Sequence, residues 1–138
     1  VAGDQELIQH FKTLRNYGGA LVPGPLQAAS AALWKDNKHV EENRALYRQK
    51  FNCADQILTG KFNYYRPSGG FYLWLNVGDS EEVTKTLWRE AGVRVIPGNY
   101  LGKTDVSGKN PGAGFIRLAL VQKPEFVKEA LIRITKTL

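Results

Sequence analysis

The N-terminal part of the chain shows helical patterns of apolar residues separated by short breaks. Residues 5–16 predict a first helix, with Asp4 placed to cap its start and a glycine pair placed to end it. The alanine-rich residues 27–34 predict a second helix. A longer amphipathic helix is predicted from His39 to Leu58, because apolar residues repeat along one face. That face consists of Val40, Tyr47, Phe51, Ala54 and Leu58.

The C-terminal part combines strand and helix patterns. Residues 71–77 alternate in the manner of a strand, and both of its faces are apolar, so we expect protein to cover it on both sides. Asp79 and Glu82 form a capping-box pattern at the start of the next helix, which Gly92 ends. The remaining predicted elements are a strand at 93–96, a structureless loop at 99–114, a strand at 115–121 and a helix from Pro124 with the buried stripe Val127, Leu131, Ile134 and Leu138.

This order of elements predicts an α/β fold in which a small sheet packs with helices, an α+β small domain preceded by a long helix. The chain has 138 residues, of which 43% are hydrophobic, and this is enough to bury a core. The length fits one domain or a piece of a larger protein. No run of apolar residues is long enough to predict a membrane span.

The formal net charge of +6 permits binding to nucleic acid, membranes or small anions, but does not require any of them. Basic residues are interspersed with acidic ones, which is typical of solvated helix faces. Cys53 is the single cysteine, so the chain has no internal disulfide, and its place on the apolar face of a helix predicts a buried thiol. A reducing cytoplasmic setting is consistent with this composition.

Arg117 lies inside the apolar strand 115–121, and it is the candidate binding residue of the sequence. A guanidinium among apolar residues is costly unless it has an anionic partner. Its planar set of donors can hold a carboxylate through two parallel hydrogen bonds. The strand therefore favours a site for a small acid. The alternatives are a solvent-facing arginine and a structural ion pair with a carboxylate of the same chain.

Other site chemistry is weakly indicated. His10 and His39 are far apart and lack neighbouring ligands, so no metal site is predicted. Residues 108–114 are rich in glycine but match no phosphate-binding loop. Tyr64-Tyr65-Arg66 could stack on bases, but a single aromatic pair is more typical of packing at the start of a strand. No catalytic residue is predicted within the chain.

Five segments in order carry a resemblance to a known family. The segments are Val1-Ala2-Gly3-Asp4, Pro23-Gly24-Pro25-Leu26-Gln27-Ala28-Ala29, Pro67-Ser68-Gly69-Gly70-Phe71-Tyr72-Leu73-Trp74, Gly92-Val93-Arg94-Val95-Ile96-Pro97-Gly98 and Ile116-Arg117-Leu118-Ala119-Leu120-Val121. With these segments, the whole chain resembles the C-terminal portion of class I/II aminotransferases, which are fold type I enzymes that use pyridoxal 5'-phosphate. The variant at residues 97–102, together with Asn110-Pro111-Gly112, is most similar to N-succinyldiaminopimelate aminotransferases.

The resemblance implies a role for several residues. Arg117 would bind the α-carboxylate of the amino-acid or keto-acid substrate. Gly70 would lie in a turn bordering the substrate entrance, and Tyr100 in a loop over the active site. Pro23-Gly24-Pro25 would lie near the interface of a homodimer and approach the partner's active site. Each of these could instead be structural: a turn into a strand, a packed ring, or a rigid entry to a helix.

The resemblance also implies a division of the chain: residues 1–37 would end the large cofactor-binding domain, 38–60 would form the connecting helix, and 61–138 the small domain. Transamination needs a lysine that holds the cofactor, and the resemblance places it upstream of Val1. We therefore expect the full-length enzyme to bind pyridoxal phosphate and this chain alone to be inactive, with neither catalytic nor cofactor-binding residues.

The expected reaction of the full-length enzyme transfers an amino group between glutamate and a keto acid in the cytoplasm. N-succinyl-2-amino-6-ketopimelate, an intermediate of lysine biosynthesis, is the favoured acceptor. Other fold type I enzymes, such as a C–S lyase or an acyl-transferring synthase, share the same small domain and stay open as alternatives. A non-catalytic module that binds anions or nucleic acid is a further alternative, as is a purely structural domain.

Overall fold

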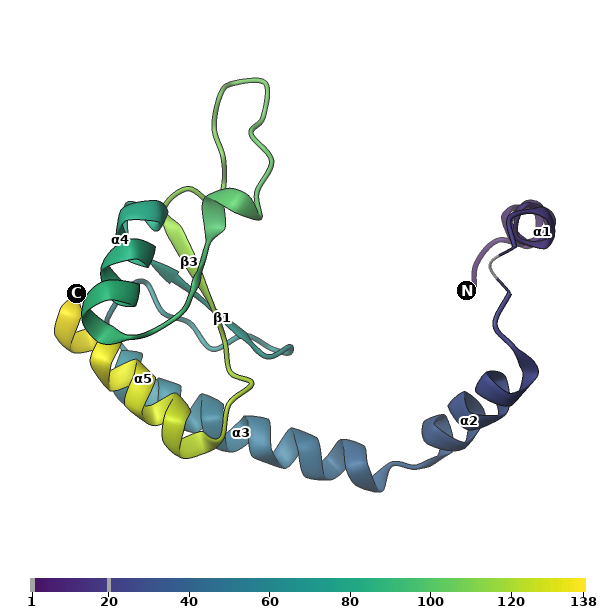
Figure 1. Cartoon of the computed structure of the whole chain (residues 1–138), viewed down its shortest axis with the longest axis horizontal. Coiled ribbons are helices and arrows are strands. Elements are labelled where there is room, and N and C mark those ends of the chain that lie inside the picture. Colours follow the sequence, from purple (N-terminus) through teal and green to yellow (C-terminus); the bar gives the residue numbers. More distant parts are fainter. Residues whose placement is uncertain (1, 20) are drawn as a thin grey trace. The chain divides into compact units, whose positions relative to one another are not determined.

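A computed structural model describes residues 2–19 and 21–138 of the chain. The chain divides into two compact units, Val1–Glu41 and Glu42–Leu138 (Figure 1). Among the described residues, no helix combines the length and the apolar character needed to cross a membrane. The proposed three-part division of the chain stays a prediction.

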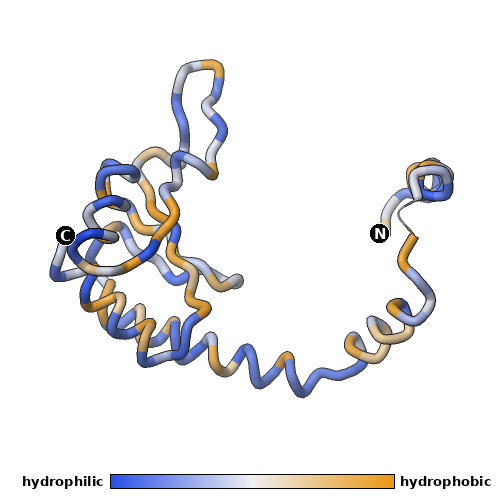
Figure 2. The backbone as a smooth tube through the Cα atoms, in the orientation of Figure 1, coloured by the Kyte–Doolittle hydropathy of each residue, from blue (hydrophilic) through white to orange (hydrophobic). Residues whose placement is uncertain are grey.

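The first unit consists mainly of helices α1 (Gln5–Tyr17) and α2 (Gly24–Lys35). Asp4 caps α1 as predicted, since its Oδ1 accepts the backbone N–H groups of Glu6 and Leu7 at 3.0 and 3.1 Å. Neither helix contains a buried residue in the part of the chain that the structure describes. Figure 2 shows α2 as hydrophobic over much of its length. Exposed apolar side chains of this kind favour packing against further protein.

Helix α3 (Lys38–Leu58) matches the long amphipathic helix predicted from the sequence. Its apolar face becomes buried toward the C-terminal end, where Phe51, Ala54 and Leu58 enter the core of the second unit. Gly60 follows with a φ of +78°, a conformation that glycine adopts without strain. The chain therefore turns back here and leads into the sheet.

The sheet has three antiparallel strands in the order β1-β3-β2. The strands are β1 (Tyr72–Asn76), β2 (Ile96–Pro97) and β3 (Phe115–Ala119). The strand predicted at 93–96 pairs only from Ile96 onward. The physical reason is local: the Val93 N–H donates to the Leu87 carbonyl, so the chain leaving the helix is bonded back to that helix instead of to the sheet.

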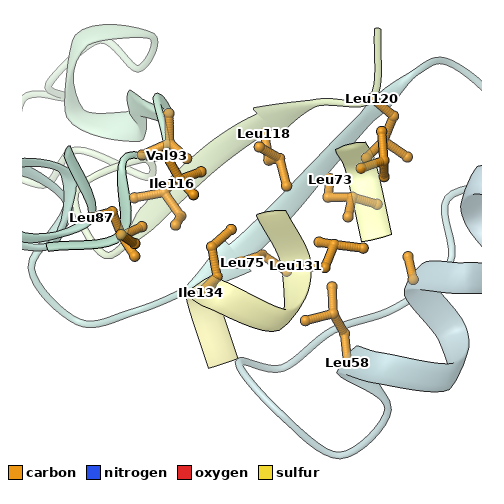
Figure 3. Packing of buried hydrophobic residues seen from close by; sticks show 14 of the residues in the cluster. Leu58, Leu73, Leu75, Leu87, Val93, Ile116, Leu118, Leu120, Leu131 and Ile134 are labelled. Carbon is orange, nitrogen blue, oxygen red and sulfur yellow. The ribbon is translucent and has the colours of Figure 1, made fainter. Parts of the chain in front are cut away.

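The core lies on one face of the sheet, between the strands and helices α3, α4 (Ser80–Thr86) and α5 (Pro124–Thr137). Figure 3 shows leucine and isoleucine side chains from β1, β3, α3 and α5 meeting there. Truncating one such leucine to alanine typically costs about 2–5 kcal/mol. The fully buried large apolar side chains are Leu58, Leu73, Leu75, Leu87, Ile116, Leu120, Leu131 and Ile134.

The opposite face of the sheet is only partly covered. Tyr72 and Trp74 on β1 and Arg117 on β3 are half-buried. The expectation that protein covers both sides of the strand at 71–77 is therefore not met by the residues that the structure describes. This half-open face holds the one charged residue of the three strands.

Two local expectations also need correction, one at Asp79 and one at Leu138. Asp79 caps α4 through the N–H groups of Glu81 and Glu82, but the reciprocal half of the capping box is absent, because the Asp79 N–H bonds to the Val77 carbonyl and Glu82 pairs with Lys85. The helix then continues as a π-helical turn, Leu87–Ala91 (η1), before Gly92 ends it. At the C-terminus, Leu138 is exposed rather than buried, because it follows the last turn of α5.

Candidate functional site

Arg117 is the centre of the candidate site. On β3 it pairs with Trp74 of β1 on one side and with Ile96 of β2 on the other. Its guanidinium carbon lies 4.3 Å from the centre of the Tyr72 ring. Its Nε is buried and has no hydrogen-bond partner. The sheet therefore holds the side chain between two strands while leaving part of its hydrogen-bonding capacity unused.

Arg117 makes no ion pair with the described residues. Ion pairs among the described residues join Asp36 to His39, Asp55 to Arg66, Glu82 to Lys85, and Glu129 to Arg133. A structural pair between Arg117 and a carboxylate of its own chain, one of the alternatives raised by the sequence, is therefore not formed within residues 2–19 and 21–138. A buried donor without a partner costs roughly 1–3 kcal/mol, so an external anion would be stabilised at this position.

The loop that follows β2 is folded at its base, contrary to the expectation of a structureless segment. It begins with a 3₁₀ turn, Gly98–Tyr100 (η2). The Asn110 side chain donates to the backbone carbonyl of Asn99 and to that of Gly102, at 2.9 and 3.1 Å, and its Oδ1 accepts the Gly112 N–H. The two ends of the loop are thereby joined next to β2 and β3.

Glycines make this loop closure possible. The backbones of Gly98 and Gly112 approach so closely that a Cβ on either residue would overlap a carbonyl oxygen of the other. The Asn99 side chain adds a bond to Glu81 Oε1 at 2.9 Å, which ties the loop to α4. The loop base is therefore a fixed element beside the sheet, and it carries Tyr100.

Tyr100 and Gly70 occupy positions next to the strands of the site. Tyr100 is 69% exposed at the end of η2, so its ring is free to meet a ligand or another part of the protein. Gly70 precedes β1 and has a φ of +86°, which explains a glycine in this turn. The described contacts do not connect Tyr100 with Arg117, so the roles of both residues stay predictions.

Pro23, Gly24 and Pro25 lie at the start of α2, in the first unit. Pro25 occupies the first turn of the helix, where a missing N–H costs nothing. This geometry agrees with a rigid helix entry, and the role at a dimer interface stays a prediction. His10 and His39 are exposed, and His39 contacts Asp36. Over residues 2–19 and 21–138, no His, Cys, Asp and Glu side chains gather in a group able to hold a metal ion.

Two further residues of the second unit were not singled out by the sequence. Tyr72 stacks on Arg117, and Lys50 of α3 is buried, with its Nζ donating to the Leu120 carbonyl at 2.7 Å. Desolvation lowers the pKa of Lys50. Lys50 also lies over the Tyr47 ring at 4.5 Å. Strand alternation places Tyr72 on the same face as Trp74, but it does not show which residue of β3 lies beside that face.

A groove of about 630 Å³ runs beside β3, between residues 92–96 and α5. Arg117 contributes to its lining together with Arg94 and Arg133. Arg133 is already bonded to Glu129 and to the Ala91 carbonyl, and Arg94 lies over the Trp88 ring. Of these three lining cations, Arg117 is the one with a buried, unbonded nitrogen.

Comparison with known proteins identifies the family. A family model described as "Aminotransferase class I and II" matches residues 1–134 of the chain. The transaminase OxyQ of Streptomyces rimosus, which acts on 4-dedimethylamino-4-oxo-anhydrotetracycline by its name, is 29% identical over 135 residues, or 97% of this chain and 36% of OxyQ. LL-diaminopimelate aminotransferase of Maridesulfovibrio salexigens is 28% identical over 130 residues, or 91% of this chain and 31% of that protein.

Solved structures agree. The crystal structure of an aminotransferase from Neisseria meningitidis matches with a TM-score of 0.91 and 39% sequence identity, covering 98% of this chain and 35% of that one. The chain thus spans about a third of the length of the relatives it matches. Its helices and small antiparallel sheet correspond to part of a fold type I aminotransferase. On these grounds the chain belongs to the class I and II aminotransferase family.

Proposed function

We propose that this chain is the C-terminal portion of a pyridoxal-phosphate-dependent aminotransferase, and that Arg117 binds the α-carboxylate of its substrates. One observation carries the assignment of the residue: the guanidinium is stacked on Tyr72, has a buried unbonded Nε, and pairs with no carboxylate of the described residues. A substrate carboxylate would supply the missing anion through two parallel hydrogen bonds. Fixing it also fixes the orientation of the Cα–H bond from which a proton is removed.

Members of this family use pyridoxal 5'-phosphate, which supplies the electron sink for transamination when it is bound. The described residues do not fit its Schiff-base site. Lys50 is the buried lysine among them, and its ammonium group is bonded to the Leu120 carbonyl within the second unit. We therefore assign cofactor binding to a part of the longer protein outside these 138 residues, and substrate binding to Arg117.

The other predicted residues complete this proposal. Tyr100 would border the substrate, because its exposed ring stands on a loop whose base Asn110 holds beside the sheet. Gly70 would shape the turn before β1 at the substrate entrance. Pro23, Gly24 and Pro25 would lie at the interface of a homodimer, where exposed apolar side chains of the first unit favour packing against further protein.

Glutamate is the proposed amino donor, and N-succinyl-2-amino-6-ketopimelate the proposed acceptor, which would place the cytoplasmic enzyme in lysine biosynthesis. The similarity to an LL-diaminopimelate aminotransferase supports an acceptor of this class. OxyQ, at a comparable identity, acts on a tetracycline precursor by its name. Relatives with this small domain therefore differ in acceptor, and the acceptor must be measured.

The test uses the full-length protein that contains this chain. Purified protein should show the visible absorbance of bound pyridoxal phosphate, and this absorbance should bleach when glutamate is added. Addition of the keto acid should restore the absorbance and yield the corresponding amino acid. A protein that releases pyruvate and ammonia, or that consumes an acyl-CoA, would instead be a C–S lyase or an acyl-transferring synthase. A protein without cofactor and without amino-group transfer would contradict the proposal.

A further inference from the structure

We propose that Tyr72 is a positioning residue for Arg117, so that it sets the affinity of the site for carboxylates without touching the substrate. This inference rests on the proposed role of Arg117 in substrate binding. It concerns how the Arg117 side chain is preorganised in the protein before a carboxylate binds. The observations are the stacking of the two side chains and the packing behind the tyrosine.

The sheet brings the two residues together. Tyr72 and Trp74 lie on the same face of β1, and Trp74 is the direct partner of Arg117 on β3. Tyr72 is therefore the diagonal neighbour of Arg117, close enough for its ring to lie 4.3 Å from the guanidinium carbon. The contact depends on the register between β1 and β3, which is fixed by the buried pairs Leu73 with Leu118 and Leu75 with Ile116.

The Tyr72 ring also packs against other aromatic rings. Its centre is 4.0 Å from that of the Phe71 ring, and the Phe71 ring lies 6.1 Å from the Tyr47 ring on α3. Lys50, one turn further along α3, lies over the Tyr47 ring and donates to the carbonyl of Leu120 just after β3. A chain of ring contacts thus connects α3 to the guanidinium, and it limits how far Tyr72 can move.

An aromatic partner can stabilise the charge of Arg117 without occupying the N–H groups that a substrate needs. A carboxylate of the same chain would stabilise the charge of Arg117 but would occupy its N–H groups and compete with the substrate. A ring stabilises the charge through its face and leaves the N–H groups at the edge of the guanidinium plane available. Restricting the rotamers of a long side chain beforehand also reduces the entropy lost on binding.

The experiment measures steady-state kinetics of the full-length enzyme with glutamate as the varied substrate. Tyr72→Leu removes the ring, whereas Tyr72→Phe keeps it. For Tyr72→Leu we expect kcat/KM to fall roughly 3- to 30-fold, the range that corresponds to one cation–π contact, with most of the change in KM. Tyr72→Phe should restore at least half of the loss on a logarithmic scale. Tyr65→Leu, at an exposed tyrosine of the second unit, is the matched control and should be neutral.

A double-mutant cycle separates positioning from a general structural effect. If Tyr72 acts through Arg117, adding Tyr72→Leu to Arg117→Ala should cause no further loss of kcat/KM. If the losses of kcat/KM of the two single variants simply add in the double variant, the inference is overturned. It is also overturned if Tyr72→Leu leaves kcat/KM unchanged while Arg117→Ala lowers it severely. Either result would leave the proposed function intact. A neutral Arg117→Ala would instead contradict the proposed function itself. Thermal unfolding of each variant shows whether a loss of activity comes from an unstable fold. If Tyr72→Leu does not fold, the kinetics of Tyr72→Phe, which keeps the ring, test the inference.

Discussion

Asn110 and Asn99 are joined by two hydrogen bonds across the base of the loop at 99–114. The Asn110 Nδ2 group donates to both the backbone carbonyl oxygen and the side-chain oxygen of Asn99, each at 2.9 Å. The same group reaches the Gly102 carbonyl at 3.1 Å. One amide side chain therefore holds the start and the end of the loop together beside the strand that carries Arg117.

Replacing this amide should loosen the loop. Asn110→Asp keeps the size and the acceptor for the Gly112 N–H but loses the donor group that bonds Asn99 and Gly102. We expect a loss of about 1–3 kcal/mol in the free energy of unfolding, because three acceptors lose their partner. Amide hydrogen exchange should rise first at residues 98–112.

Asn43→Asp, at an exposed position of α3, is the matched control for the change of chemistry and should leave exchange in the loop unchanged. Equal exchange in the loop of Asn110→Asp and of the unchanged chain would show that the amide does not hold the loop.

The close approach of Gly98 and Gly112 makes a second prediction. Gly98→Ala places a methyl group against backbone carbonyl oxygens of Gly112 and Phe115, which cannot move aside without separating β2 from β3. We expect a loss of about 1–3 kcal/mol, the usual cost of overpacking. Gly69→Ala is the control, since nothing lies within 4 Å of its added methyl group. Chemical denaturation of both variants measures the difference, and equal stabilities would refute the close packing.

Asp55 gives a prediction of pH dependence. The Tyr64 hydroxyl donates to its Oδ1 at 2.6 Å, and Arg66 pairs with its other oxygen; these contacts lower the pKa of the carboxyl group below 3.8. A carboxylate with a lowered pKa in the folded state stabilises the fold above the unfolded value, and this stabilisation is lost as pH falls through the folded pKa. Asp55→Asn should cost about 1 kcal/mol at neutral pH, since the pair is partly exposed.

The difference between Asp55→Asn and the unchanged chain should shrink as pH falls below 3.8. Glu90→Gln, at an exposed position of η1, serves as the control for removing a negative charge. Unfolding curves at several pH values give the result, and a difference that stays constant down to the acid limit would contradict the role of the ionised carboxylate.

Local patterns explain why much of the fold could be predicted. Asp4 and Asp79 cap helices where the sequence places them, and Gly60 and Gly92 end helices through backbone conformations that favour glycine. Arg117 stood out because it interrupts an apolar strand. Each of these signals is contained within a few neighbouring residues.

The missed features depend on residues that are distant in the sequence. The stacking of Tyr72 on Arg117 follows from the register of two strands, which the pattern of either strand alone does not determine. The bonds from Asn110 to Asn99 require the loop to close on itself. The start of β2 was misplaced because the Val93 N–H bonds to the preceding helix, a choice that apolar periodicity does not reveal.

The central claim is that Arg117 binds the substrate carboxylate, and the kinetics of Arg117→Ala in the full-length enzyme test it most directly. Removing one partner of a hydrogen-bonded charge pair costs roughly 2–5 kcal/mol, so kcat/KM for glutamate should fall by about 30-fold to several thousand-fold. Arg48→Ala is the matched control, because Arg48 is an exposed arginine of α3 that does not line the groove beside β3. A large loss for Arg117→Ala with a near-normal Arg48→Ala is the predicted result, and equal kinetics of the two variants would contradict the claim.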